Sequence, residues 1–222
     1  MRSGRRPLGA RPRSYGTRTG LATAAAALAA GSWMIYAGTR TEAPPLPDAS
    51  QAVVRSVQVP APSAIPMAPS PPTAIRIPSI GVDAPVIGLD ADQTGHLQTP
   101  PEADDNLAGW YEDGARPGST GNAVITGHVD TPRGRAVFYA LGALHKGDTI
   151  AVTRADRSTA LFSVYGVEVH PKNAFPNELV YGATQQPELR VITCGGRYTK
   201  ATGYQANVVV YARLAKAVPA GH

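Results

Sequence analysis

The single cysteine of this 222-residue chain, Cys194, follows an apolar segment that ends in Val191-Ile192-Thr193 and precedes two glycines. The β-branched residues predict a strand and the Gly-Gly pair predicts its end, so we expect the thiol at a partly exposed strand edge. Upstream, the apolar segment 123–126 ends at Gly127 and is followed by His128. A thiol and an imidazole at two strand ends are typical of a cysteine nucleophile with its acid/base partner.

A buried structural cysteine is the alternative interpretation, because lone cysteines often pack as small hydrophobes. The glycines after Cys194 favour a reactive thiol, since glycine allows a ligand or another backbone to approach closely. The other histidines are scattered along the chain and supply no metal-ligand spacing, so we expect no metal and no cofactor. They are His96, His145, His170 and His222.

Short apolar or alternating segments separated by turn residues occupy the chain from Thr73 onward. This pattern is typical of a β barrel or sandwich, and we expect one domain over 73–222. Apolar residues that recur at three and four predict two short helices, over 106–111 and 137–144. Strands are expected over 74–86, where prolines indicate sheet edges, and near 96–99, 123–126, 149–153, 160–169, 189–193 and 207–213.

The net charge of +5 comes from the start of the chain. Seven of the 21 basic residues are arginines within the first forty residues, and no acidic residue precedes Glu42. Acidic residues slightly outnumber basic ones in the rest of the chain. We therefore expect no nucleic-acid binding by a broad basic face.

Residues 21–38 form a mostly apolar, alanine-rich stretch whose length suits a helix that spans a bilayer. The arginines before it predict a cytoplasmic tail over 1–20 and an extracellular C-terminal domain. A cleaved signal peptide is the alternative, but the apolar stretch is longer than a typical signal sequence requires. We expect a single-pass membrane protein with an uncleaved anchor.

Nine prolines lie among alanine, serine and valine between residues 39 and 72. Such a composition favours extended polyproline-like segments and supplies too little apolar side chain for a core. We expect a disordered stalk that holds the domain away from the membrane.

Three elements follow one another along the chain: Thr126-Gly127-His128, Val191-Ile192-Thr193-Cys194, and the closing Asn-Val-Val-Val-Tyr-Ala at 207–212. In this order they resemble the sortase family, and in particular its actinobacterial class F. The resemblance extends from about residue 75 to residue 212.

The resemblance implies a closed, mainly antiparallel β barrel and a monomeric cysteine transpeptidase. Such enzymes cleave an LPxTG-like sorting signal at the C-terminus of surface proteins and join the new acyl end to an amine of a cell-wall precursor. In that scheme Cys194 attacks the threonine carbonyl and holds a thioacyl intermediate. His128 protonates the leaving amine and then deprotonates the incoming amine. The thioester conserves the energy of the peptide bond for aminolysis, with hydrolysis as a side reaction.

Sortases also use an arginine that donates hydrogen bonds to the substrate carbonyl or the oxyanion. In the best-known members it lies thirteen residues after the cysteine, and that position holds Asn207 here. We expect Arg197, in the loop after Cys194, to take this role, with Asn207 as a neutral donor. Lys200 in the same loop and Arg190 on the cysteine strand are the alternatives.

Two further residues are candidates for substrate binding. Thr193 precedes the nucleophile, and strand alternation places it on the opposite face, which leaves both a structural role and a substrate contact open. Asp130 lies two residues after His128, where its carboxylate either orients the imidazole or caps the next turn.

Other functions are possible for an exported β domain with one cysteine. The cysteine is unreactive if the domain is a binding or structural module. Another cell-wall cysteine transpeptidase is the second alternative, although the Ser-His-Gly-Cys element of L,D-transpeptidases is absent from this sequence. A papain-type peptidase has its cysteine before its histidine, the reverse of the order here.

Overall fold

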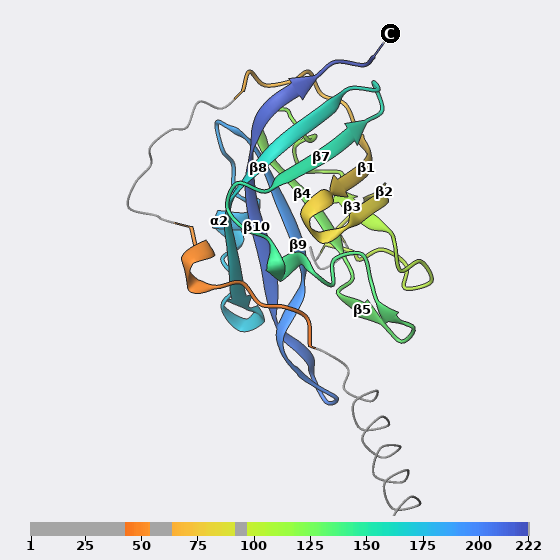
Figure 1. Cartoon of the computed structure of the whole chain (residues 1–222), viewed down its shortest axis with the longest axis vertical. Helices are drawn as coiled ribbons and strands as arrows, with labels where there is room; N and C mark the ends of the chain where they lie inside the picture. Colours follow the sequence, from red (N-terminus) through yellow and green to blue (C-terminus); the bar gives the residue numbers. More distant parts are fainter. Residues whose placement is uncertain (1–42, 54–63, 92–96, 222) are drawn as a thin grey trace, which may run out of the picture. The chain divides into compact units, whose positions relative to one another are not determined.

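The structure is a computed structural model that describes residues 43–53, 64–91 and 97–221 (Figure 1). The expected cytoplasmic tail and membrane anchor, over 1–20 and 21–38, lie outside these residues. Among the helices of the described residues, none has the length and apolar character needed to span a membrane.

Eight strands close into one barrel in the order β1-β2-β3-β4-β9-β10-β8-β7. Neighbouring strands are antiparallel except for the β2–β3 and β4–β9 pairs, which are parallel. This confirms the predicted mainly β, closed barrel. The strands are β1 (Pro72–Ile77), β2 (Val82–Leu89), β3 (Ala108–Tyr111), β4 (Gly121–Gly127), β7 (Thr149–Arg154), β8 (Thr159–Pro171), β9 (Pro187–Thr199) and β10 (Gly203–Val218).

The other elements are short and connect or cover the strands. A small hairpin formed by β5 and β6 follows β4, and the segment between β8 and β9 contains the single described α-helix. These elements are β5 (Asp130–Thr131), β6 (Gly134–Arg135), α2 (Asn177–Tyr181), and the 3-10 helices η1 (Ala49–Gln51), η2 (Pro78–Ile80), η3 (Leu141–Ala143) and η4 (Lys172–Ala174).

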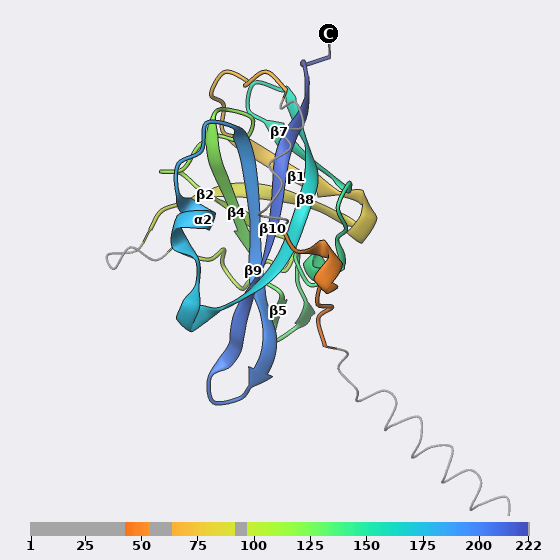
Figure 2. The same cartoon turned by 90° about the vertical axis from the view of Figure 1, so that its left-hand side faces the viewer.

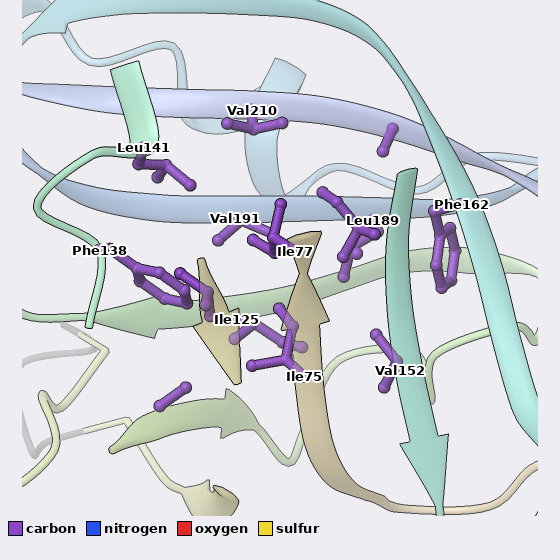
Figure 3. Packing of buried hydrophobic residues seen from close by; sticks show 14 of the residues in the cluster. Ile75, Ile77, Ile125, Phe138, Leu141, Val152, Phe162, Leu189, Val191 and Val210 are labelled. Atoms are coloured by element: carbon purple, nitrogen blue, oxygen red, sulfur yellow. The ribbon is translucent and has the colours of Figure 1, made fainter. Parts of the chain in front are cut away.

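The side chains of β9 alternate between two apolar clusters. Leu189 and Val191 point into the barrel, where they pack with other fully buried side chains such as Ile75 and Ile125 (Figure 3). Ile192 belongs to a second cluster on the outer face, together with residues of β4, β10 and α2. Each such branched side chain contributes roughly 1.5–3 kcal/mol when buried. This burial fixes which face of β9 each residue occupies, and the alternation places Cys194 on the outer face.

Three of the predicted local structures are wrong. The helix expected over 106–111 is strand β3, which pairs with β2 on one side and β4 on the other. Ala108 and Trp110 are both buried, at a spacing of two, so burial in the sheet overrides the weak helical pattern. The helix expected over 137–144 is reduced to the single turn η3. The strand expected at 96–99 is only an isolated bridge between Ala91 and Leu97 in the part of the chain that the structure describes.

The strand that carries the cysteine also continues farther than predicted. β9 passes through Gly195 and Gly196 and ends at Thr199, where it turns into β10. Gly196 has a φ of 77°, and the register with β10 shifts at this point, so the glycines bend the strand instead of ending it. The resulting β9–β10 hairpin extends past the rest of the barrel (Figure 2).

Parts of the proline-rich segment contact the barrel. The Val53 N–H donates to the Glu168 carboxylate on β8, at 2.8 Å. Beyond residues 54–63, which lie outside the described residues, the Ala64 N–H donates to the Leu214 carbonyl and the Met67 N–H to the Gly118 carbonyl. Contacts with the barrel therefore begin earlier in the chain than Thr73, the start that the sequence predicts for the domain.

Candidate active site

His128, directly after β4, and Cys194, within β9, lie at the same level of two neighbouring parallel strands. In the β4–β9 ladder Thr126 pairs with Ile192, and the Thr193 hydroxyl donates to the Gly127 carbonyl at 2.8 Å. One residue further along each strand stand His128 and Cys194, both half-buried. The structure thus brings the two predicted catalytic residues together where β4 ends beside β9.

The residue before His128 has to be small. A Cβ on Gly127 would lie 2.6 Å from Val137 and 2.7 Å from the ring of Phe138, closer than real contacts allow. The Phe138 N–H also donates to the His128 carbonyl, at 3.0 Å. This close packing fixes the backbone from which the imidazole projects.

The His128 imidazole is oriented by a backbone carbonyl. Its Nε2 lies 2.7 Å from the oxygen of Pro100. Because a carbonyl only accepts hydrogen bonds, Nε2 must carry the proton of this pair. The other nitrogen, Nδ1, is then the atom that can exchange a proton with the reactants.

Asn207 on β10 pairs with Cys194 on one side and with His170 on β8 on the other. The three residues form a row across three adjacent strands. Asn207 is half-buried, and its side chain lines a pocket of about 650 Å³. The other residues that line this pocket are Ala91, Leu97, Tyr111, Lys172, Phe175, Asn177 and Tyr181.

Lys172 is a site residue that the sequence did not indicate. It is the first residue after β8, and its Nζ lies 3.6 Å from the Cys194 Sγ. The approach depends on β10 lying between β8 and β9, an arrangement that no local pattern records. A sequence search for cations near Cys194 considers only the flanking segments and misses it.

The predicted cation, Arg197, lies on the exposed part of the β9–β10 hairpin, beyond the bend at Gly196. Lys200 is exposed in the turn that follows. Arg190 has a different environment, since it is buried and pairs with Glu188 at 2.6 Å. Its guanidinium also lies 4.8 Å from the centre of the Tyr211 ring, so packing on the outer face holds it.

Asp130 and Thr193 each form a hydrogen bond within the chain. The Tyr204 hydroxyl donates to the Asp130 Oδ2 at 2.5 Å, which links the β5–β6 hairpin to the β9–β10 hairpin. Burial, followed by this hydrogen bond, raises the pKa of Tyr204 well above the usual value for a phenol. Thr193 is buried, and its hydroxyl bond to Gly127 connects the two strands that carry the site.

A charged clamp holds the segment that contains Pro100. Arg133 donates through Nε and Nη2 to the two oxygens of Asp105, at 3.0 and 2.9 Å, and through Nη2 to the Glu102 carbonyl at 2.8 Å. The Thr131 hydroxyl donates to the same carboxylate at 2.6 Å. The hydrogen bonds from Arg133 and Thr131 lower the pKa of Asp105 below its usual range.

The family model for the sortase domain matches residues 75–215. The chain therefore belongs to the sortase family, whose members are typically cysteine transpeptidases. No curated protein sequence matches it.

Solved sortase structures share the fold. Sortase A of Listeria monocytogenes is 19% identical, with 65% of this chain and 87% of that chain covered and a TM-score of 0.50. The sortase SrtA of Actinomyces oris is 20% identical, with 72% and 89% covered and a TM-score of 0.50. Sortase C1 of Streptococcus agalactiae is 18% identical, with 65% and 67% covered and a TM-score of 0.51. At these identities the likeness is one of fold alone.

Proposed function

We propose that this chain is a class F sortase that cleaves an LPxTG-like sorting signal and transfers the acyl fragment to an amine of a cell-wall precursor. One observation supports this most strongly. His128 and Cys194 lie at the same level of the parallel β4–β9 pair, and the Lys172 and Asn207 neighbours of Cys194 both line a pocket. A thiol and an imidazole on neighbouring strands at one level, with a pocket beside the thiol, suit acyl transfer.

The reaction follows from these positions. The Cys194 thiolate attacks the threonine carbonyl of the signal, and the carbonyl π electrons move to oxygen. When the oxyanion collapses, the carbon–nitrogen bond breaks and His128 gives a proton to the leaving amine. An incoming amine then loses a proton to His128 and attacks the thioester carbonyl. Its nitrogen forms the new amide bond, and the Cys194 thiolate leaves.

The other predicted residues have supporting roles in this proposal. Asn207, beside Cys194, donates an amide N–H to the oxyanion without adding charge. Asp130 and Thr193 border the substrate site. Each also stabilises its surroundings through a hydrogen bond, Asp130 with Tyr204 and Thr193 with Gly127. Arg197 reaches the oxyanion only if the exposed hairpin brings its guanidinium back over the sulfur.

The proposed partners are surface proteins that end in an LPxTG-like signal, together with the cell-wall amine acceptor. The enzyme acts as a monomer without a metal or cofactor. In this proposal residues 21–38 anchor it in the cell membrane, and the barrel lies on the extracellular side.

The test uses the full-length chain in detergent with a quenched LPxTG-type peptide, with and without a glycine-based amine. We expect cleavage that the amine accelerates, and a thioacyl adduct on Cys194 by mass spectrometry. The Cys194→Ala variant should be inactive, and His128→Ala should lose about 100-fold or more in kcat. Absence of both cleavage and adduct with every amine would instead support a binding domain with an unreactive cysteine.

A further inference from the structure

Lys172 reaches Cys194 across an intervening strand. β8 ends at Pro171, which pairs with Ala206 on β10, and β10 in turn pairs with β9. Lys172 leaves the barrel at this point, and its side chain extends over β10 so that Nζ lies 3.6 Å from Sγ. Neighbouring strands are about 4.8 Å apart, so β8 and β9 are two such spacings apart, a span that the long lysine side chain and its contact with the sulfur cover together.

The ammonium of Lys172 has no carboxylate partner among the described residues, whereas the guanidinium of Arg190 is paired with Glu188. Lys172 is also exposed and lines the pocket beside Asn207. Its charge is therefore directed at the sulfur and the adjacent pocket, and no carboxylate in the described part of the chain pairs with it.

We infer that Lys172 is a catalytic residue that supplies the positive charge for the reacting sulfur and the oxyanion, in place of the arginine found in other sortases. This inference rests on the proposed function of Cys194. An ammonium has three donors and no acceptor, so it stabilises an anion without taking part in the proton transfers of His128. A flexible side chain also suits a charge that has to move between two atoms.

The charge follows the electrons during the reaction. Before attack the negative charge lies on Sγ, and Lys172 donates to it. As the sulfur–carbon bond forms, the carbonyl π pair moves to oxygen and the ammonium donates to that oxyanion. When the carbon–nitrogen bond breaks, the oxyanion becomes the thioester carbonyl, and the proton on the leaving amine comes from His128. Lys172 keeps all its protons throughout.

The experiment reads the charge at Cys194 independently of peptide cleavage. Iodoacetate and iodoacetamide alkylate the same thiolate, but only iodoacetate carries a negative charge. Because the chain has a single cysteine, both rates report on Cys194. In the full-length chain, Lys172→Met should lower the iodoacetate-to-iodoacetamide rate ratio about fivefold. Lys172→Arg should preserve the ratio, and Lys172→Gln is the second neutral variant.

The same variants are then assayed with the quenched peptide. Lys172→Met should lower kcat/KM about 100-fold, and Lys172→Arg should recover most of it. Lys216→Met removes a charge from an exposed lysine on the same strand as Asn207, and it should match the wild type in both assays. Thermal unfolding checks that every variant is folded.

Two results would overturn the inference. One is an unchanged rate ratio in both Lys172→Met and Lys172→Gln. The other is an Arg197→Met variant that loses activity while Lys172→Met retains it, which would assign the role to Arg197. If the wild-type chain cleaves no sorting signal, the proposed function fails, but the alkylation ratio still decides whether Lys172 places its charge at Sγ.

Discussion

Asn207 and Cys194 are direct partners in the antiparallel ladder between β9 and β10. The position thirteen residues after the cysteine is thus its neighbour in space, even though a hairpin turn separates the two in sequence. In this chain the neighbour is a carboxamide, which donates hydrogen bonds but carries no charge. Asn207 therefore supplies no charge to the site, and the cation in contact with Cys194 is Lys172, whose Nζ lies 3.6 Å from Sγ.

We predict a graded response to changes at Asn207. Asn207→Ala should lower kcat about tenfold, because a neutral hydrogen-bond donor near the oxyanion is lost. Asn207→Asp should lower it further, since a carboxylate repels both the thiolate and the oxyanion. Steady-state cleavage of the quenched peptide measures both effects. Gln186→Glu, which adds the same charge at an exposed position before β9, serves as the control. An Asn207→Asp variant as active as the wild type would remove Asn207 from the site.

The contact between His128 and Pro100 predicts a specific imidazole tautomer. Neutral His128 should carry its proton on Nε2, because that nitrogen lies 2.7 Å from a carbonyl oxygen. Two-dimensional NMR that correlates the ring nitrogens with the ring carbon-bound protons distinguishes the two tautomers in a sample labelled with ¹⁵N on histidine. His128→Ala identifies the signals. A proton found on Nδ1 would contradict the geometry and would leave Nε2 as the reactive nitrogen.

The sequence predicted the features that depend on local patterns. Apolar alternation located most strands of the barrel, and the apolar segments that precede Cys194 and His128 indicated both residues. Strand β3 was missed because Ala108–Tyr111 is stabilised by pairing with β2 and β4, and neither partner is recorded in the segment itself. The continuation of β9 was missed for a related reason. Its glycines end a strand in isolation, but here the partner strand β10 continues the ladder.

The surroundings of the site depend on topology and were not predicted. Lys172 approaches Cys194 because β8, β10 and β9 are neighbours, and their order in the barrel differs from their order in the chain. Arg133 and Asp105 likewise meet only after the chain has passed through β3 and β4. Long side chains that reach across such distances leave no periodic signal in a sequence.

The clamp between Arg133 and Asp105 predicts a dependence of stability on acid. The folded-state pKa of Asp105 is lower than its unfolded value. The contribution of Asp105 to the free energy of unfolding is therefore complete above the usual carboxyl pKa near 4. It is lost as the pH falls through the depressed folded-state pKa. Urea unfolding at a series of pH values measures this effect. As the pH falls, the free energy of unfolding should decrease less steeply in Asp105→Asn and in Arg133→Met than in the wild type.

The same clamp should affect catalysis through Pro100. Arg133 also holds the Glu102 carbonyl, in the segment whose Pro100 carbonyl orients His128. We expect Arg133→Met to lower kcat about tenfold at neutral pH with little change in KM, since orientation of the base is lost while the pocket is unchanged. Wild-type kinetics in this variant, or an increase in KM with kcat unchanged, would show that the clamp stabilises the fold without positioning the imidazole.

The bond between Tyr204 and Asp130 predicts the behaviour of the site in alkali. Burial and the Asp130 carboxylate both raise the pKa of Tyr204, so the phenol stays protonated after ordinary tyrosines ionise near pH 10. A folded-state pKa above the unfolded one gives a contribution that is complete below pH 10 and is lost as the pH rises through the raised value. In Tyr204→Phe the free energy of unfolding should therefore decrease less steeply above pH 10 than in the wild type. In Asp130→Asn, absorbance at 295 nm should show a tyrosine that ionises at lower pH than in the wild type.

Tyr198, whose exposed ring lies 5.0 Å from that of Tyr204, provides the matched control. Tyr198→Phe removes a hydroxyl from the same hairpin, and an equally shallow decrease in both variants would mean that the bond to Asp130 has no special role.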